Sequence, residues 1–217
     1  MIEFKEIPRC YSTVNRIINR TNAQNNWRYE LGKPKVKLTG KRVQKIIYLC
    51  QLFWFMDHEN SNMIPEDFVA WPNGPIIPEI YNYWMVYQDG DMCPCPYVKD
   101  ELSEEEADLI NIVVDNTIDI STEAIIDYIQ LHDVAWQQAY KGTQCKNSII
   151  TKYSIKQYIQ KEENQRELFN FIKSETNKCE NSRFAKKRTA SISTKIVDLK
   201  GGYILWLYII IEFIKYL

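Results

Sequence analysis

Residues 70–81 of the chain read Ala-Trp-Pro-Asn-Gly-Pro-Ile-Ile-Pro-Glu-Ile-Tyr. The pair Asn73-Gly74 predicts a tight turn, because glycine adopts positive φ at little cost. Pro78 fits the first position of a helix, and Glu79 follows in the first turn, where the helix dipole favours an anion. The segment contains no nucleophile and no general base, so we predict a rigid corner that feeds a helix. At this corner we expect at least partial burial of Trp71, Pro75, Pro78 and Tyr81.

Helical periodicity dominates on both sides of this corner. Apolar residues recur at helical spacing over residues 41–57, and a further helix is predicted over residues 122–131. Weaker patterns predict helices over residues 13–23 and 165–178. Ser103 and Glu106 form a capping box before an apolar stripe, and Ser154 with Gln157 predicts a second box that opens a short helix. Strand signals are thin, with one short extended piece over residues 68–71. The fold class is therefore mainly α, a compact helical domain with at most a minor β element.

Composition limits the class of protein. The chain has 217 residues, of which 45% are hydrophobic and 25% are charged, with seven Gly and eight Pro. These values supply a sizeable core and exclude disordered and fibrous classes. Residues 183–193 have little apolar content and read as a basic linker. We therefore expect the packed domain over residues 10–163 and a C-terminal extension over residues 164–217.

The near-neutral net charge of −1 conceals a strong contrast along the chain. Residues 1–40 hold eight Lys/Arg and three Asp/Glu, whereas residues 66–133 hold sixteen Asp/Glu and one Lys. Residues 181–200 are basic again, with six Lys/Arg and one Asp. Two interpretations stay open: internal charge complementarity between solvated helix faces, or an acidic surface that meets a basic protein partner.

The C-terminal tail is strongly apolar. Residues 203–211 are nine apolar residues in a row, but Glu212 and Lys215 follow, and a spanning helix needs about 20 apolar residues. We expect the tail to be buried or bound by a partner, with a peripheral membrane contact or an anchor as alternatives. The candidate partner-binding residues are Tyr203, Trp206 and Tyr208.

Signals for catalysis and metal binding are weak. The chain has two histidines, His58 and His132, and carries none of the common phosphate-binding, hydrolase or metalloprotease motifs. The pair Cys93-Pro-Cys95 has no matching second pair, so we expect neither a metal nor a cofactor. No apolar export segment follows Met1, so we expect a cytoplasmic protein with reduced thiols. We expect no enzyme; an enzyme that uses His132 is the weaker alternative.

Four segments resemble a known family in the same order. Residues 42–51 read Arg-Val-Gln-Lys-Ile-Ile-Tyr-Leu-Cys-Gln, similar to the "LQKLLYLAQ" helix of the Panacea domain. Residues 70–81 resemble its "AW-x-x-GPVVPEVY" signature, and residues 131–140 resemble its "THxxxPW…A" segment. Residues 149–159 resemble its closing helix. The chain departs from the family at Leu131 and Ala135, where the family has Thr and Pro.

The resemblance implies a mainly α-helical antitoxin domain without catalytic activity. Members neutralise unrelated toxins of bacterial and phage toxin–antitoxin pairs, usually by direct protein–protein binding, with flanking segments that choose the toxin. Residues 10–163 would then be the Panacea-like domain and a cognate protein toxin the partner. The alternative is a nucleic-acid-binding autoregulator that uses the basic residues 183–188. The family-motif positions carried over to this sequence are Gln44, Trp71, Gly74, Pro75, Pro78, Glu79, Tyr81, His132 and Trp136.

Overall fold

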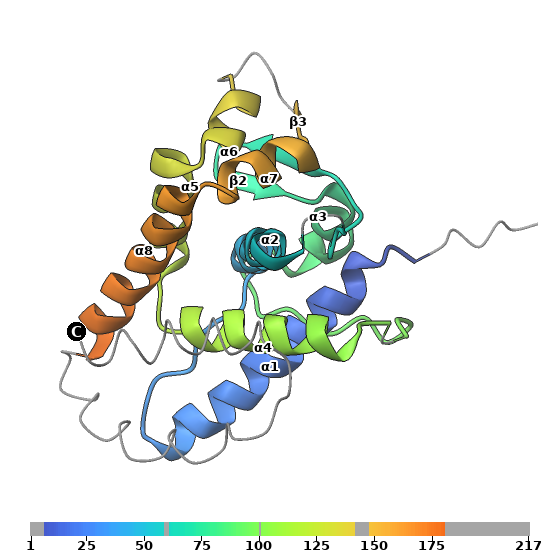
Figure 1. The fold of residues 1–217 in the computed structure, drawn as a ribbon. Helices are drawn as coiled ribbons and strands as arrows, with labels where there is room; N and C mark the ends of the chain where they lie inside the picture. The colour runs from blue at the N-terminus through green and yellow to red at the C-terminus, as the bar shows by residue number, and fades with distance from the viewer. Residues whose placement is uncertain (1–6, 59–60, 100, 142–147, 181–217) are drawn as a thin grey trace, which may run out of the picture. The chain divides into compact units, whose positions relative to one another are not determined.

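The computed structural model describes residues 7–58, 61–99, 101–141 and 148–180 (Figure 1). Helices make up most of these residues, which confirms the predicted mainly α class with a minor β element. The elements in order are α1 (Cys10–Glu30), α2 (Gly40–Asp57), β1 (Phe68–Trp71), β2 (Gly74–Ile76), α3 (Pro78–Trp84), the 3-10 helix η1 (Met85–Tyr87), α4 (Glu104–Thr117), α5 (Thr122–His132), α6 (Val134–Ala139), β3 (Ser148–Ile150), α7 (Lys152–Ile159) and α8 (Glu162–Glu180).

Helix α2 is the centre of the core. It contacts α1, α3, α4, α5, α7 and β2, and Figure 1 shows it nearly end-on between these elements. Every residue from Arg42 to Phe55 is buried, so the helix is covered on all sides rather than along one apolar stripe. Four of these buried residues are polar or charged, namely Arg42, Gln44, Lys45 and Gln51. Buried polar groups need hydrogen-bond partners, and these side chains find them on the backbone of other segments.

A small antiparallel sheet covers one side of α2, in the strand order β2-β1-β3. The pairing places Trp71 opposite Gly74 and Ala70 opposite Ser148. Strand β1 has the predicted bounds, whereas β2 and β3 were not predicted. Each of those two strands is three residues long, and β3 pairs with residues about 80 positions earlier in the chain, so no local pattern marks it.

The helix ends test the predicted caps. The capping box of Ser103 and Glu106 is present in full and opens α4. The box predicted at Ser154 is wrong, because α7 begins at Lys152 and its N-cap is Thr151, whose hydroxyl accepts the amide hydrogen of Ser154. Thr151 follows β3 directly, so the turn from strand to helix sets the cap three residues earlier. Helices α1 and α8 are also longer than the predicted ranges.

The basic start of the chain pairs with the acidic middle along the contact between α1 and α4. Arg9 makes a two-pronged hydrogen bond to Glu106 at 2.7 and 2.8 Å. Arg20 pairs with Asp115, and Arg28 pairs with Asp119 close to the end of α4. Arg9 is the N-cap of α1 and the other two arginines lie on that helix, and their carboxylate partners follow in the same order along the chain. Internal complementarity therefore accounts for part of the charge contrast.

Helix α8 carries the packing beyond residue 163. Leu168 is fully buried, and the ring of Phe169 lies 5.7 Å from that of Phe53 on α2. The chain divides into a unit Met1–Cys179 and a unit Glu180–Leu217, so α8 runs across the position at which the sequence predicted the domain to end. The basic residues 183–188 and the tail candidates Tyr203, Trp206 and Tyr208 lie outside the described residues. None of the described helices has the length and apolar content to cross a membrane.

Candidate functional site

The β1–β2 hairpin and the start of α3 form the predicted corner. Gly74 has φ +88°, the left-handed region that favours glycine, and Pro78 is the first residue of α3 with Glu79 in its first turn. A Cβ atom at Gly74 would lie 3.2 Å from both Cε and Nζ of Lys45. The turn therefore brings its backbone against a lysine of α2, at a distance that an added side chain would crowd.

Two side chains of α2 hold the backbone of this corner. The Gln44 amide accepts from Ile77 N at 2.8 Å and donates to Ile77 O at 3.1 Å, which satisfies both backbone groups of that residue. Lys45 donates from Nζ to Pro75 O at 2.6 Å and is 1% exposed. Burial lowers the pKa of Lys45 from 10.5 to about 7, and nearby Lys41 adds to the effect. Gln44 is a family-motif position, whereas the role of Lys45 was not predicted.

Helices α5 and α6 hold the other side of the same hairpin. Gln130 Nε2 donates to Pro72 O at 2.7 Å, and the Trp136 indole donates to Trp71 O at 3.2 Å. Trp136 is buried and stacks on Tyr140 with ring centroids 4.7 Å apart. Side chains from three helices thus bind four carbonyl groups of the hairpin and the residue after it. Two of the motif residues, Gln44 and Trp136, use their polar groups in backbone hydrogen bonds, which is typical of a scaffold.

The predicted burial of the corner holds for Trp71, Pro75 and Pro78, which are buried or half-buried. Tyr81 keeps 44% of its surface exposed, and its ring meets that of Trp71 edge-on at 4.9 Å. Glu79 is exposed, and its backbone carbonyl accepts from Tyr11 Oη at 3.1 Å.

Large apolar side chains are exposed on α3, on η1 and at Tyr97, and we call this set of residues the α3 surface. Met85 is 54% exposed and Val86 is 76% exposed. The other members are Tyr81, Tyr83 and Tyr97. Tyrosine and methionine are enriched in protein–protein interfaces, so this composition is typical of a binding surface.

Replacing Gly74 tests the contact between the turn and α2. We expect Gly74→Ala to lower the free energy of unfolding by about 2–3 kcal/mol, since alanine is strained at positive φ and its Cβ would crowd Lys45. Gly32 is a matched control, because it has φ +65° with no atom within 4 Å of an added Cβ. Gly32→Ala should cost only the backbone strain of about 1 kcal/mol. Equal losses in urea denaturation would show that the Lys45 contact has no effect.

The candidate His132 is the last residue of α5, and Asp133 joins α5 to α6. His132 Nδ1 lies 2.7 Å from Glu167 Oε1 on α8, so its side chain faces α8. The contact with α2 at this corner is made by the next residue, Asp133, which accepts from Tyr48 Oη at 2.5 Å and from Trp136 N at 3.0 Å. The sequence analysis missed Asp133, although an Asp between two helical patterns is a standard N-cap signal.

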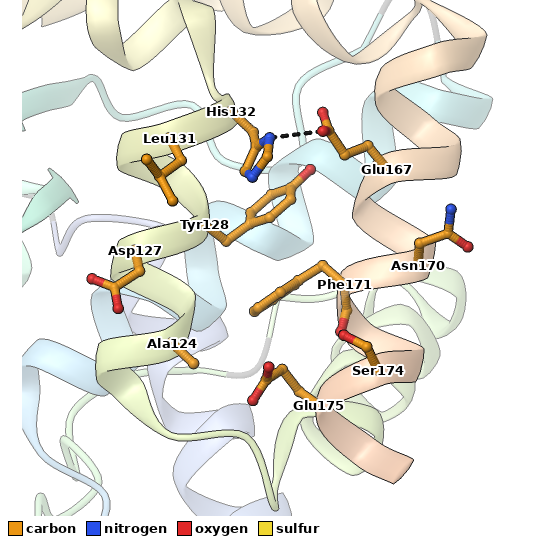
Figure 2. A pocket seen from close by; sticks show the side chains of 10 residues that line it. All are labelled: Ala124, Asp127, Tyr128, Leu131, His132, Glu167, Asn170, Phe171, Ser174 and Glu175. Atoms are coloured by element: carbon orange, nitrogen blue, oxygen red, sulfur yellow. Dashed lines mark hydrogen bonds and ion pairs between the residues drawn. The ribbon is translucent and has the colours of Figure 1, made fainter. Parts of the chain in front are cut away.

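A groove of ≈490 Å³ lies between α5 and α8 (Figure 2). Figure 2 shows Phe171 and Glu175 reaching from α8 toward α5, below the pair of His132 and Glu167. The residues that line it are Ala124, Asp127, Tyr128, Leu131, His132, Glu167, Asn170, Phe171, Ser174 and Glu175.

The described residues contain no group of three His, Cys, Asp or Glu side chains placed to hold a metal ion. Cys93 is exposed and Cys95 is buried, and both are free thiols. The side chains of Cys145 and Cys179 lie outside the described residues.

Comparison with known proteins gives a match to a family model. Residues 43–137 match the family model described as "Antitoxin SocA-like, Panacea domain". No curated protein and no solved structure matches the chain. The matched segment begins in α2 and ends in α6. It contains residues 70–81 in full, overlaps residues 42–51 and 131–140, and includes all nine family-motif positions, whereas residues 149–159 lie outside it. Over residues 43–137, the chain is therefore similar to the Panacea domain of SocA-like antitoxins.

Proposed function

We propose that this protein is the antitoxin of a bacterial or phage toxin–antitoxin system and neutralises a co-encoded protein toxin in the cytoplasm by direct binding, without catalysis. The observation that carries the proposal is the use of the motif residues. The polar groups of Gln44 and Trp136 form hydrogen bonds with the backbone of the hairpin corner. A catalytic site would instead leave such polar groups free to contact a substrate. The family match supports the antitoxin role of such a scaffold.

The α3 surface supports binding to a protein. Four of its five residues lie on α3 and η1, which directly follow the corner held by Gln44 and Lys45. A partner would therefore meet a pre-organised surface, and little conformational entropy would be lost there. Three basic residues in the N-terminal part of the chain argue against nucleic acid as the partner of this unit. Arg9 and Arg20 pair with carboxylates of α4, and Arg28 pairs with a carboxylate between α4 and α5, so the charges of these three arginines are already compensated.

Co-expression with the product of a neighbouring small gene tests the function. The full chain should restore growth to cells that express the toxin, and the two proteins should purify together. A toxin that is neutralised without forming a complex would contradict direct binding, and a neighbouring gene product that is harmless or not neutralised would contradict the antitoxin role.

Substitution on the α3 surface tests where the toxin binds. We expect Met85→Glu/Val86→Glu to weaken the complex at least about ten-fold, because two carboxylates would have to be desolvated in the interface. Tyr29→Glu is the control. Tyr29 is 84% exposed near the end of α1, which contributes no residue to the α3 surface. An equal loss for the control, or no loss for the double variant, would exclude the α3 surface.

A further inference from the structure

The groove between α5 and α8 has features of its own that the hairpin corner does not explain. Its inner wall is aromatic: Tyr128 and Phe171 stack with centroids 4.5 Å apart, and His132 stacks on Tyr128 at 5.1 Å. The Tyr128 hydroxyl is fixed by a hydrogen bond of 3.1 Å to the hydroxyl of Tyr158. This hydrogen bond and the stacking hold the ring of Tyr128 in place, so the aromatic wall of the groove is rigid.

Acidic side chains surround this aromatic wall. Asp127, Glu167 and Glu175 are among the ten lining residues, and these ten include no Lys or Arg. Two of the carboxylates have partners: Glu167 pairs with His132, and Glu175 pairs with Lys178 at 2.5 Å on the same helix. The side chain of Lys178 is 70% exposed, and exposed ion pairs within a helix are readily exchanged for a better partner. Asp127 is exposed on α5.

Apolar contact area continues at the edge of the groove. Leu131 is 70% exposed on α5, one turn from Asp127 along the helix. An occupant that fits this arrangement must offer apolar side chains to Phe171 and Leu131 and cationic side chains to the carboxylates. An amphipathic segment with Leu and Arg or Lys three to four residues apart meets both demands. The acidic wall repels nucleic acid and acidic peptides.

We propose that the groove between α5 and α8 binds a basic amphipathic segment of a protein partner. The inference rests on the proposed function, because the partner would be the toxin. The groove would then be a second binding surface for the toxin, in addition to the α3 surface. A guanidinium group would pair with Asp127 or Glu175, and charge-assisted hydrogen bonds of this kind are among the stronger ones in proteins. The aromatic wall would take the apolar face of the segment.

A peptide probe tests the groove without the toxin. The probe is a labelled peptide of about twelve residues with Leu and Arg in helical spacing, and its partner peptide has every Leu replaced by Ser at the same charge. We expect the full chain to bind the Leu-containing peptide at least about ten-fold more tightly than the Ser-containing peptide. Equal affinity for the two peptides would reduce the site to a general acidic surface and overturn the proposal.

Two variants and a control assign the binding to the groove. Asp127→Lys/Glu175→Lys should weaken binding of the Leu-containing peptide at least about ten-fold, and Phe171→Ala should weaken it by a similar factor. Glu101→Lys/Glu104→Lys makes the same charge change at exposed positions near the start of α4, and should change binding less than about three-fold. Circular dichroism and thermal unfolding check that each variant is folded. An equal effect of the control variant would overturn the assignment.

The groove proposal and the antitoxin function can be rejected independently of each other. If the wild-type chain rescues growth and purifies with the toxin but binds neither peptide, the groove proposal is rejected and the antitoxin function stands. If the groove variants lose the peptide while no neighbouring gene product is neutralised, the groove is a basic-segment site and the antitoxin function is rejected.

Discussion

Arg42→Met should lower the free energy of unfolding by about 3–5 kcal/mol, a large fraction of the stability of a domain of this size. Arg42 is 4% exposed and donates to three backbone carbonyls where α4 ends. The distances are 2.7 Å to Thr117 O, 3.2 Å to Ile118 O and 2.7 Å to Ile120 O. These carbonyls include groups that the end of a helix leaves without intrahelical partners. Methionine fills the space but supplies no donor, so buried acceptors would remain unsatisfied.

The position of Arg42 in the first turn of α2 is unfavourable for a cation with respect to the dipole of that helix. The structure gives the compensation, because the guanidinium caps the C-terminal end of another helix, where the dipole favours a cation. Burial lowers the pKa of Arg42 to about 10, and nearby Asp119 and Glu123 oppose that effect. The side chain is therefore charged at neutral pH and acts as a fixed link between α2 and α4.

Lys41 is the matched control for Arg42. It is the preceding residue, it carries the same charge, and it is exposed. Lys41→Met should change the free energy of unfolding by less than about 0.5 kcal/mol. Arg42→Lys should lose about 2 kcal/mol, because one ammonium group cannot reproduce the forked geometry of the guanidinium. A loss below about 1 kcal/mol for Arg42→Met in urea denaturation would show that water replaces the lost donors.

Local signals explain what the sequence predicted well. The capping box of Ser103 and Glu106 and the helix start at Pro78 each depend on residues within one turn of one another. The bounds of β1 follow from a short β-prone run that a proline ends. The family motif also pointed to Gln44 and Trp136, both of which bind the hairpin corner.

Long-range partners explain what the sequence did not predict. Lys45 binds a carbonyl 30 positions away, Arg42 binds carbonyls 75 to 78 positions away, and Tyr48 binds Asp133 across 85 positions. A helical pattern shows that α2 is apolar, but it does not show that the polar residues of the helix are also buried. The groove between α5 and α8 escaped prediction for the same reason, since its walls are about 40 residues apart in sequence.

The buried carboxyl group of Asp133 should make the stability of the protein depend on pH. Asp133 is fully buried, and burial raises its pKa from 3.8 to about 6, although the hydrogen bonds from Tyr48 and Trp136 favour the ionised form. Between these two pH values the folded protein holds a proton that the unfolded chain has released. The contribution of Asp133 to stability is therefore full at low pH and is lost as the pH rises through about 6, with a total change of about 3 kcal/mol.

Asp133→Asn removes this titration while it keeps the shape of the side chain. Its oxygen can still accept from Trp136 N, and its amide nitrogen can donate to the Tyr48 oxygen. Relative to the wild type, Asp133→Asn should gain about 2 kcal/mol in the free energy of unfolding between pH about 4.5 and pH about 7.5. A difference between the two proteins that stays constant over this range would contradict a raised pKa of Asp133.

Asp133→Ala separates the hydrogen bonds from the charge. It deletes the N-cap of α6 and leaves the hydroxyl of Tyr48, which is 0% exposed, without its acceptor. We expect a loss of about 2–4 kcal/mol at pH about 5, where the wild-type carboxyl is mostly protonated in the folded state. Asp127→Asn on the exposed face of α5 is the control and should change the free energy of unfolding by less than about 0.5 kcal/mol at the same pH. Asp133 connects α5 and α6 to α2, so its loss should also weaken the hydrogen bond of Trp136 to the hairpin. Hydrogen exchange at the amides of β1 and β2 should therefore be faster in Asp133→Ala than in the wild type, and unchanged in the control.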